Sequence, residues 1–284
     1  MPGDHAQHGT AGPDDLAVVN RATGRAWSVL GRLTGGRSDI VQLLGHGRAR
    51  AVLKIKHGAW WAAQLERAAE LVDALRAAGY PTPPVLGFGP LGGDRFYLAT
   101  EFVPGVQPAG LDAGLARDVL AAVDLHSAVR PPEIRDWSTM ITEFLNGGIA
   151  EHRFHPRLAS LADRALALVP RPVPALPSGD FVHGDFTTRN LLARGPRLSA
   201  VVDVEGFGRG TRTIDLVSLL ASVASGSGPI ADLVLERAVA ASDEQTVRAC
   251  LAHRALALLL TAAESPKGVD AVADQVGGVL AMVT

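Results

Sequence analysis

The chain has 284 residues, of which 47% are hydrophobic and 20% are charged. This apolar content suffices for a sizeable core, excludes a disordered chain or a mini-protein, and predicts one or two domains. Lysine and arginine number 27 against 29 acidic residues, giving a formal net charge of -2. Such a chain has no global positive field for a nucleic-acid backbone or an anionic membrane, so we expect neither partner.

Cysteine usage and the N-terminal residues predict a cytoplasmic protein. The single cysteine, Cys250, cannot form an internal disulfide or a cysteine-rich zinc site. Met1–Asp15 lacks the basic flank and apolar run of a signal peptide, and we expect residues 1–26 to be a flexible tail and lead-in. The longest charge-free stretches, 77–93 and 216–231, are short and broken by proline and glycine, so no transmembrane helix is predicted.

After the tail, the chain has the pattern of a β-rich region with one helix. Short apolar runs bounded by turn residues predict strands at Trp27–Leu33, Ile40–Leu44, Ala51–Lys56, Pro83–Phe88 and Phe96–Phe102. Apolar residues at helical spacing predict a helix over Trp61–Ala78, which Gly79 and Pro81 end. We therefore expect a small β-rich domain over residues 27–102.

Beyond residue 102 the pattern becomes mostly helical. Apolar residues at helical spacing predict helices within Leu111–Val129, Pro156–Val169, Leu216–Ser222, Ile230–Ala241 and Asp243–Ala263. A polar segment containing Trp137, Glu143 and Asn146 separates the first two. The exception is Phe181–Val204, where two apolar runs bracket a polar loop. Residues 103–284 are expected to form a larger helical domain.

The stretch FVHGDFTTRNLLARGPRLSAVVD, at 181–203, is the part of the sequence that points to chemistry. Asp185 and Asn190 share one loop, and Asp203 ends the next strand. Phosphoryl transfer requires a carboxylate within hydrogen-bond reach of the acceptor hydroxyl, and oxygen ligands for the magnesium that bridges the phosphates. These three residues supply both.

HGDFTTRN followed by Asp203 resembles the kinase catalytic loop, in the form used by the aminoglycoside phosphotransferase and choline kinase-like superfamily. The resemblance covers nearly the whole chain from Trp27. It implies a two-lobed α+β protein-kinase-like fold, with a small β-rich N-terminal lobe, a larger, mostly helical C-terminal lobe, and ATP or GTP between them. It also implies Mg²⁺.

The resemblance also implies roles for the residues of the loop. Asp185 would be the base or the carboxylate that orients the acceptor, and His183 would brace the loop. Asn190 and Asp203 would hold Mg²⁺, and Glu205 would touch the metal shell. Further along, Gly210 precedes Asp215-Leu216 in the family's G-x-x-x-x-D-L pattern, and Asp215 is expected to brace the catalytic loop.

In this family a lysine on the third strand contacts the ATP phosphates. Lys54 holds that place in VLKIK, although Lys56 lies on the same strand face and stays an alternative. A helix glutamate should pair with this lysine. We favour Glu66 over Glu70, and a solvated helix acid explains either residue equally well.

Two further segments resemble nucleotide contacts of the family. Gly35, Gly36 and Ser38 belong to a short turn that would cover the phosphates, although a plain hairpin turn also explains it. Glu101 and Val103 lie where the hinge between the lobes offers backbone groups to adenine, and the alternative is an edge strand that ends at a proline.

The expected activity is transfer of phosphate from ATP to a hydroxyl of a small molecule. The offset of 12 positions from Asp203 to Asp215 leaves no room for the peptide platform of a protein kinase. An antibiotic, inactivated by phosphorylation, is the first expectation for the acceptor. The alternatives are a kinase acting on a metabolite (a sugar, an amino alcohol or a hydroxy amino acid) and a non-catalytic pseudokinase. The sequence indicates no oligomeric state.

Overall fold

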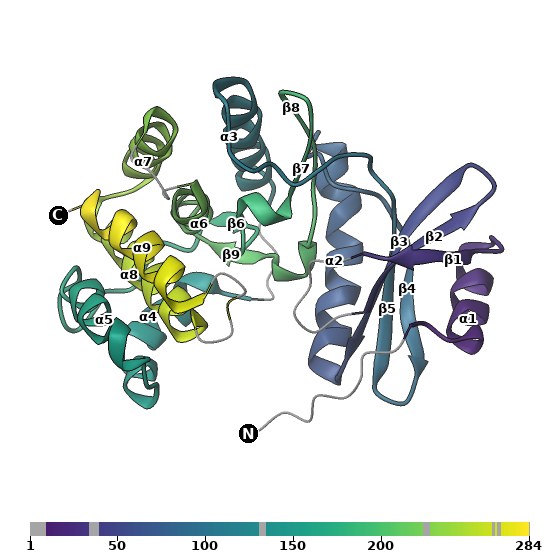
Figure 1. Cartoon of the computed structure of the whole chain (residues 1–284), viewed down its shortest axis with the longest axis horizontal. Helices are drawn as coiled ribbons and strands as arrows, with labels where there is room; N and C mark the ends of the chain where they lie inside the picture. Colours follow the sequence, from purple (N-terminus) through teal and green to yellow (C-terminus); the bar gives the residue numbers. More distant parts are fainter. Residues whose placement is uncertain are drawn as a thin grey trace. The chain divides into compact units, whose positions relative to one another are not determined.

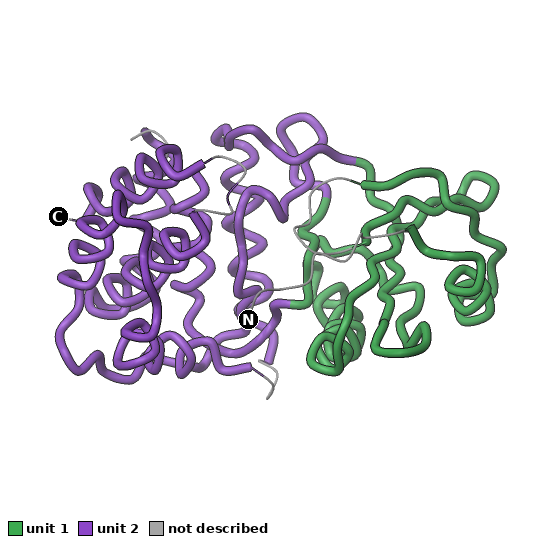
Figure 2. The backbone as a smooth tube through the Cα atoms, turned by 60° about the horizontal axis from the view of Figure 1, so that its bottom comes forward, with its two compact units in different colours: residues 1–104, 200–205 green, residues 105–199, 206–284 purple. Residues whose placement is uncertain are grey.

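A computed structural model describes residues 10–33, 40–130, 135–223, 228–262, 265 and 268–283. The chain forms two compact units (Figure 2). Unit 1 comprises residues 1–104 and 200–205, and unit 2 comprises residues 105–199 and 206–284. The first boundary lies close to the one expected after residue 102, but residues 200–205, expected in the helical domain, belong to unit 1.

The described part of unit 1 is built on a five-stranded antiparallel sheet of order β1-β2-β3-β5-β4 (Figure 1). Its strands are β1 (Ser28–Arg32), β2 (Ile40–His46), β3 (Ala49–His57), β4 (Val85–Gly92) and β5 (Arg95–Glu101). The predicted strands are confirmed, but β4 continues past Phe88, where the predicted strand ends, to Gly92. In the register, Lys54 of β3 lies opposite Val41 of β2 and Leu98 of β5.

Helix α2 (Ala59–Ala77) covers the sheet face that carries Lys54. Its Leu65 and Ala69 pack against Leu98 of β5, and directly paired residues of neighbouring strands share a face. The predicted helix is therefore confirmed, and its packing places Lys54 beneath α2 instead of in open solvent.

The expected flexible tail contains a helix, α1 (Pro13–Thr23). It begins with a proline in its first turn and ends at Gly24, which takes the left-handed conformation that suits glycine. Val19 packs in the core on the other sheet face, and Asp15 accepts a hydrogen bond from Arg95 at 2.9 Å. For residues 13–23 the expectation was wrong because these tertiary contacts, and not local periodicity, stabilise the helix. Residues 1–9 of the expected tail lie outside the described residues.

Unit 2 is mostly helical in its described residues. The α-helices are α3 (Ala113–Ser127), α4 (Trp137–Asn146), α5 (Ala159–Leu166), α6 (Thr213–Val223), α7 (Pro229–Ala241), α8 (Glu244–Leu260) and α9 (Gly268–Ala281). The short 3-10 segments are η1 (Gly148–Glu151), η2 (Pro156–Leu158), η3 (Thr188–Asn190) and, where the chain returns from unit 1, η4 (Val204–Gly206). Helix α6 is buried and packs against α7, α8 and α9, so it forms the centre of the unit.

Two short antiparallel ladders complete unit 2. Strand β6 (Asp180–Val182) pairs with β9 (Gly208–Gly210), and β7 (Leu191–Arg194) forms a ladder with β8 (Arg197–Val201). The polar segment expected between the first two helices is instead the helix α4. Its Ile141 and Leu145 are buried one turn apart, and Asp136 caps it by accepting a hydrogen bond from Thr139.

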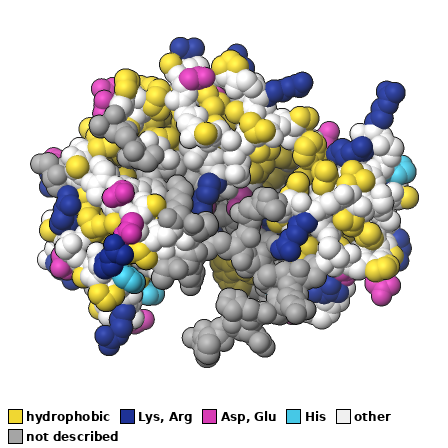
Figure 3. All heavy atoms as spheres, in the orientation of Figure 1, with side chains coloured by type: hydrophobic (Ala, Val, Ile, Leu, Met, Phe, Trp, Pro, Cys, Tyr) yellow, Lys and Arg dark blue, Asp and Glu magenta, His cyan; other side chains and the backbone are white. Residues whose placement is uncertain are grey.

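The expected fold class is confirmed, with a β-sheet N-terminal region and a helical C-terminal region. No helix in the described part of the chain is long and apolar enough to cross a membrane. On the face shown in Figure 3, Lys and Arg side chains lie singly among acidic and hydrophobic ones, and its described residues form no broad basic patch.

Candidate active site

The loop after β6 makes a sharp turn at Gly184. Its φ is 82°, and a Cβ at this position would lie 2.4 Å from Cε2 of Trp137. Only glycine combines this conformation with this approach of the tryptophan ring. The Trp137 indole in turn donates a hydrogen bond to the carbonyl of Gly206 at 2.8 Å. The turn is thus held against α4, and Asp185 follows it directly.

Asp215, in the first turn of α6, binds the backbone of this loop through its carboxylate. Its Oδ2 accepts a hydrogen bond from the amide of His183 at 2.7 Å, and its Oδ1 accepts one from the amide of Gly184 at 2.9 Å. His126 of α3 contacts the same carboxylate through Nε2, at 2.9 Å from Oδ2. Asp215 therefore has the bracing position that the sequence predicts. His126 adds a positioning contact that sequence reasoning missed.

His183 lies in the core of unit 2, where it is fully buried. Its ring packs edge-on against Phe186 and Phe207, with centroids 5.8 and 5.3 Å away. The amide of Asp185 lies 3.4 Å from its Nδ1. These contacts anchor the residue to the loop and to Phe207, which follows η4, and this suits the bracing role proposed for it.

Asp185 and Asn190 contact each other across the loop. The Asn190 amide nitrogen donates to the backbone carbonyl of Asp185 at 2.8 Å and to its Oδ2 at 3.2 Å. The Asp185 side chain is 43% exposed and so accessible from solvent. Its Oδ1 lies 3.4 Å from Nη1 of Arg254, a residue of α8 that the sequence analysis did not single out. A half-exposed carboxylate held from two sides can accept a proton from a small molecule.

Lys54, Asp203 and Glu205 form a compact cluster in unit 1. The Lys54 ammonium lies 2.5 Å from Oδ1 of Asp203 and 2.6 Å from Oε1 of Glu205. Asp203 has a φ of 66°, a left-handed conformation that is unusual for a residue with a side chain and costs about 1–3 kcal/mol. Such strain is found where a side chain must be aimed at a functional position.

Burial and the ion pairs set the charges of this cluster. Burial opposes the Lys54 charge, but Glu205 and Asp203 outweigh it and raise the pKa of Lys54 above its usual value. Burial raises the pKa of Glu205 to about 7, although Lys54 acts in the opposite direction. Glu205 Oε2 is buried and has no hydrogen-bond partner among the described residues, which leaves an acceptor atom for a metal ion or its water.

The ion pair expected between Lys54 and Glu66 is not found among the described residues. Glu66 and Glu70 are both exposed, because they lie on the side of α2 opposite the apolar residues that face the sheet. Among the described residues, Lys54 pairs with Asp203 and Glu205 instead. Lys56, the alternative lysine, places its ammonium 3.8 Å from the centre of the Trp61 ring. The acidic cluster therefore belongs to Lys54.

Of the remaining predicted nucleotide contacts, the structure describes Glu101 and Val103. Glu101 is exposed at the end of β5, and its amide donates to the carbonyl of Pro84 at 3.0 Å. Val103 follows in an irregular, partly buried segment. Gly35, Gly36 and Ser38 lie outside the described residues.

The described residues hold no cluster of three or more His, Cys, Asp or Glu side chains arranged as metal ligands. The predicted magnesium ligands are instead an amide and two carboxylates. Asn190 belongs to unit 2, and Asp203 and Glu205 belong to unit 1. Amide and carboxylate oxygens are the donors that Mg²⁺ takes, so the residues fit this metal by their chemistry.

The sheet with one covering helix, the helical unit and the braced HGD loop define the class as a kinase-like phosphotransferase. The chain belongs to the Phosphotransferase enzyme family, whose model matches residues 29–275. No protein with a curated description matches it in sequence.

Solved structures share the fold at low sequence identity. A thermostable mutant of aminoglycoside phosphotransferase APH(4)-Ia, in a ternary complex with ADP and hygromycin B, is 16% identical with a TM-score of 0.67, covering 94% of this chain and 97% of that one. Macrolide 2'-phosphotransferase MphH from Brachybacterium faecium is 18% identical with a TM-score of 0.59, covering 93% and 98%. A putative fructosamine-3-kinase from Haemophilus somnus 129PT is 11% identical with a TM-score of 0.61, covering 94% and 96%.

Proposed function

We propose that this phosphotransferase moves the γ-phosphate of ATP to a hydroxyl of a small-molecule acceptor, in the cytoplasm, and that the acceptor is an antibiotic. The contact between Asp185 and Asn190 in one braced loop carries the proposal, because it puts a proton acceptor beside a metal-binding amide. The cluster of Lys54, Asp203 and Glu205 supports it from unit 1.

Asp185 would accept the proton of the attacking hydroxyl. As the hydroxyl oxygen forms its bond to phosphorus, the bond from phosphorus to the oxygen of ADP breaks, and the hydroxyl proton passes to a carboxylate oxygen of Asp185. The hydrogen bonds from Asn190 and the braced backbone hold this carboxylate in one orientation. Such positioning supplies much of the rate enhancement in phosphoryl transfer.

Lys54 would neutralise oxygens of the triphosphate. Its pKa is raised by Glu205 and Asp203, against the effect of burial, so it stays protonated throughout the physiological range. Mg²⁺, when bound by Asn190 and Asp203 with Glu205 beside it, supplies positive charge that offsets the charge of the phosphates. Glu101, Val103 and the glycine turn with Ser38 remain proposed nucleotide contacts.

Structural neighbours described as aminoglycoside and macrolide phosphotransferases support an antibiotic acceptor. The neighbour described as a putative fructosamine-3-kinase supports the second candidate, a metabolite kinase. A non-catalytic pseudokinase is disfavoured because Lys54, Asp185, Asn190 and Asp203 are all present.

Mass spectrometry of a compound library, incubated with the protein, ATP and Mg²⁺, tests the proposal. It should reveal at least one hydroxylated antibiotic that gains a phosphate, and Asp185→Asn should abolish the gain. Asp163→Asn, which changes an exposed acid of α5, is the matched control and should keep the activity. Phosphate gain by metabolites alone would favour the second candidate, and unchanged turnover by Asp185→Asn would contradict the role of Asp185.

A further inference from the structure

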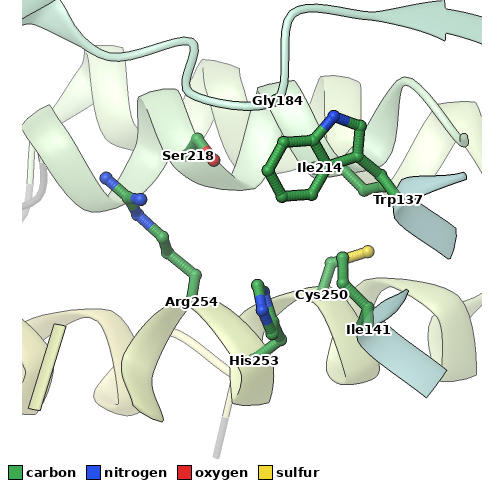
Figure 4. Close-up of a pocket in the computed structure, with 8 residues that line it drawn as sticks. All are labelled: Trp137, Ile141, Gly184, Ile214, Ser218, Cys250, His253 and Arg254. Carbon is green, nitrogen blue, oxygen red and sulfur yellow. The ribbon is translucent and has the colours of Figure 1, made fainter. Parts of the chain in front are cut away.

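A small pocket lies beside the catalytic loop within unit 2 (Figure 4). Residues of α4, α6 and α8 line it together with the turn before Asp185: Trp137, Ile141, Gly184, Ile214, Ser218, Cys250, His253 and Arg254. Figure 4 shows the Arg254 side chain extending from α8 toward the side of the pocket where Ser218 and Gly184 lie. The pocket therefore borders the turn before Asp185, the proposed proton acceptor, and is lined by the guanidinium-bearing Arg254.

Among the described residues, Arg254 makes few of the hydrogen bonds that its guanidinium group can donate. Its side chain is only 17% exposed, and the ion pair to Asp185 is long, at 3.4 Å. The buried Nε has no hydrogen-bond partner among the described residues. An arginine carries five N–H donors in a planar fork, and leaving a buried donor of a charged group unpaired is costly. A ligand that brings oxygen acceptors into this pocket would relieve that cost.

The charges around the pocket favour an anion. Arg189, on the η3 segment of the same loop, lies near enough to lower the pKa of Arg254, in addition to the larger effect of burial. Burial and Arg254 lower the pKa of His253 to about 4, so this histidine is neutral at pH 7. The other lining side chains are uncharged, and the carboxylate that contacts Arg254 is that of Asp185, at 3.4 Å.

We propose that Arg254 is a specificity-determining residue that binds a carboxylate of the acceptor, so that the acceptor is a hydroxy acid. This inference rests on the proposed phosphotransferase function. The fork of arginine fits a carboxylate in a bidentate manner, and the contact with Asp185 places that carboxylate near the reacting hydroxyl. A polycationic acceptor would instead bring positive charge against Arg254. The acceptor class therefore differs from polycationic aminoglycosides.

A simpler role for Arg254 would be to orient Asp185 without binding the acceptor. An orienting residue affects the chemical step for every acceptor alike and so lowers kcat throughout. A residue that binds the acceptor carboxylate affects acids and spares their amides, and it acts mainly on KM. Comparing each acid with its own primary amide therefore distinguishes the two roles.

The experiment measures ADP release and phosphorylated product with matched pairs: gluconate and gluconamide, mupirocin and its amide, with hygromycin B as the polycationic probe. The wild-type enzyme should prefer the acid in a pair by at least tenfold in kcat/KM. Arg254→Gln should remove that preference by raising KM for the acid. Arg254→Lys, which keeps the charge and loses the fork, should be intermediate.

Arg248→Gln is the matched control, because Arg248 lies on the same helix, is exposed and pairs with Glu244. It should keep the acid preference. A wild-type enzyme that phosphorylates amides or hygromycin B as readily as acids would overturn this inference alone, and so would an equal loss of kcat on acid and amide in Arg254→Gln. A wild-type protein that turns over no ATP with any compound would overturn the proposed function itself.

Discussion

His126 of α3 and Asp215 of α6 form a fully buried pair, with Nε2 of the histidine 2.9 Å from Oδ2 of the aspartate. Because Asp215 also accepts hydrogen bonds from the amides of His183 and Gly184, this pair connects α3 to the loop that carries Asp185. The Asp215 carboxylate thus holds the catalytic loop, and His126 of α3 in turn holds the carboxylate.

His126→Ala should therefore loosen the loop and destabilise the fold. The change leaves a buried carboxylate with one partner fewer and opens a cavity, so we expect a loss of about 2–4 kcal/mol in the free energy of unfolding. Urea denaturation measures it. His57→Ala removes an exposed histidine from unit 1 and should cost less than about 0.5 kcal/mol. Equal losses in the two variants would contradict the bracing role.

Lys54 and Lys56 offer a direct comparison between two lysines on one strand face. Lys54→Met should lower kcat/KM for ATP by about 100-fold or more, because it removes a charge aimed at the phosphates. Lys56→Met should have a much smaller effect, since Lys56 lies over the Trp61 ring. Measurements of ADP release at varied ATP concentration decide between them. The reverse order of effects would assign the phosphate contact to Lys56.

Gly184→Ala tests the geometry of the turn before Asp185. The added Cβ would meet the Trp137 ring at 2.4 Å, and the backbone has a φ of 82°. We expect destabilisation by about 2–4 kcal/mol from the overlap and the strained backbone together. Gly195→Ala is the control, because its φ of 61° has the same sign but nothing lies within 4 Å of the added atom. Thermal unfolding that treats both variants alike would show that the tryptophan contact is unimportant.

His253 predicts how stability depends on pH. Burial and Arg254 lower its pKa from 6.5 to about 4, so the unfolded chain binds its proton at a higher pH than the folded protein does. Its contribution to stability is complete above pH 6.5 and is lost as the pH falls toward 4, by at most about 1.4 kcal/mol per pH unit. His253→Gln should flatten the unfolding free energy between these values. A slope that the substitution leaves intact would assign the titration to other groups.

Local patterns in the sequence predicted the elements that show a clear apolar period or a recognisable motif. The sheet of unit 1 and α2 follow from short apolar runs and helical spacing, and the HGD loop follows from its motif. Helices α1 and α4 were missed because a few buried contacts stabilise them, such as Val19 in the sheet core and Ile141 in unit 2. The short strands β7 and β9 have too few residues to show a period.

The residues of the site show the same division. Asp185, Asn190 and Lys54 could be predicted because their spacing to neighbouring motif residues is short or conforms to a strand. Arg254 lies 69 positions from Asp185, and no local sequence pattern predicts a contact between residues so far apart along the chain. The partner of Lys54 was misplaced for a related reason. A helix glutamate was expected, but the tertiary fold supplies Glu205, 151 positions away.

If Asp185, Asn190 and Asp203 act together on one nucleotide, a crystal structure with a non-hydrolysable ATP analogue and Mg²⁺ should show all three around it. We expect oxygen atoms of Asn190 and Asp203 to coordinate the magnesium ion, with the Asp185 carboxylate facing the terminal phosphate and Lys54 contacting the phosphate oxygens. A nucleotide bound elsewhere, or a metal ion held by neither Asn190 nor Asp203, would contradict it.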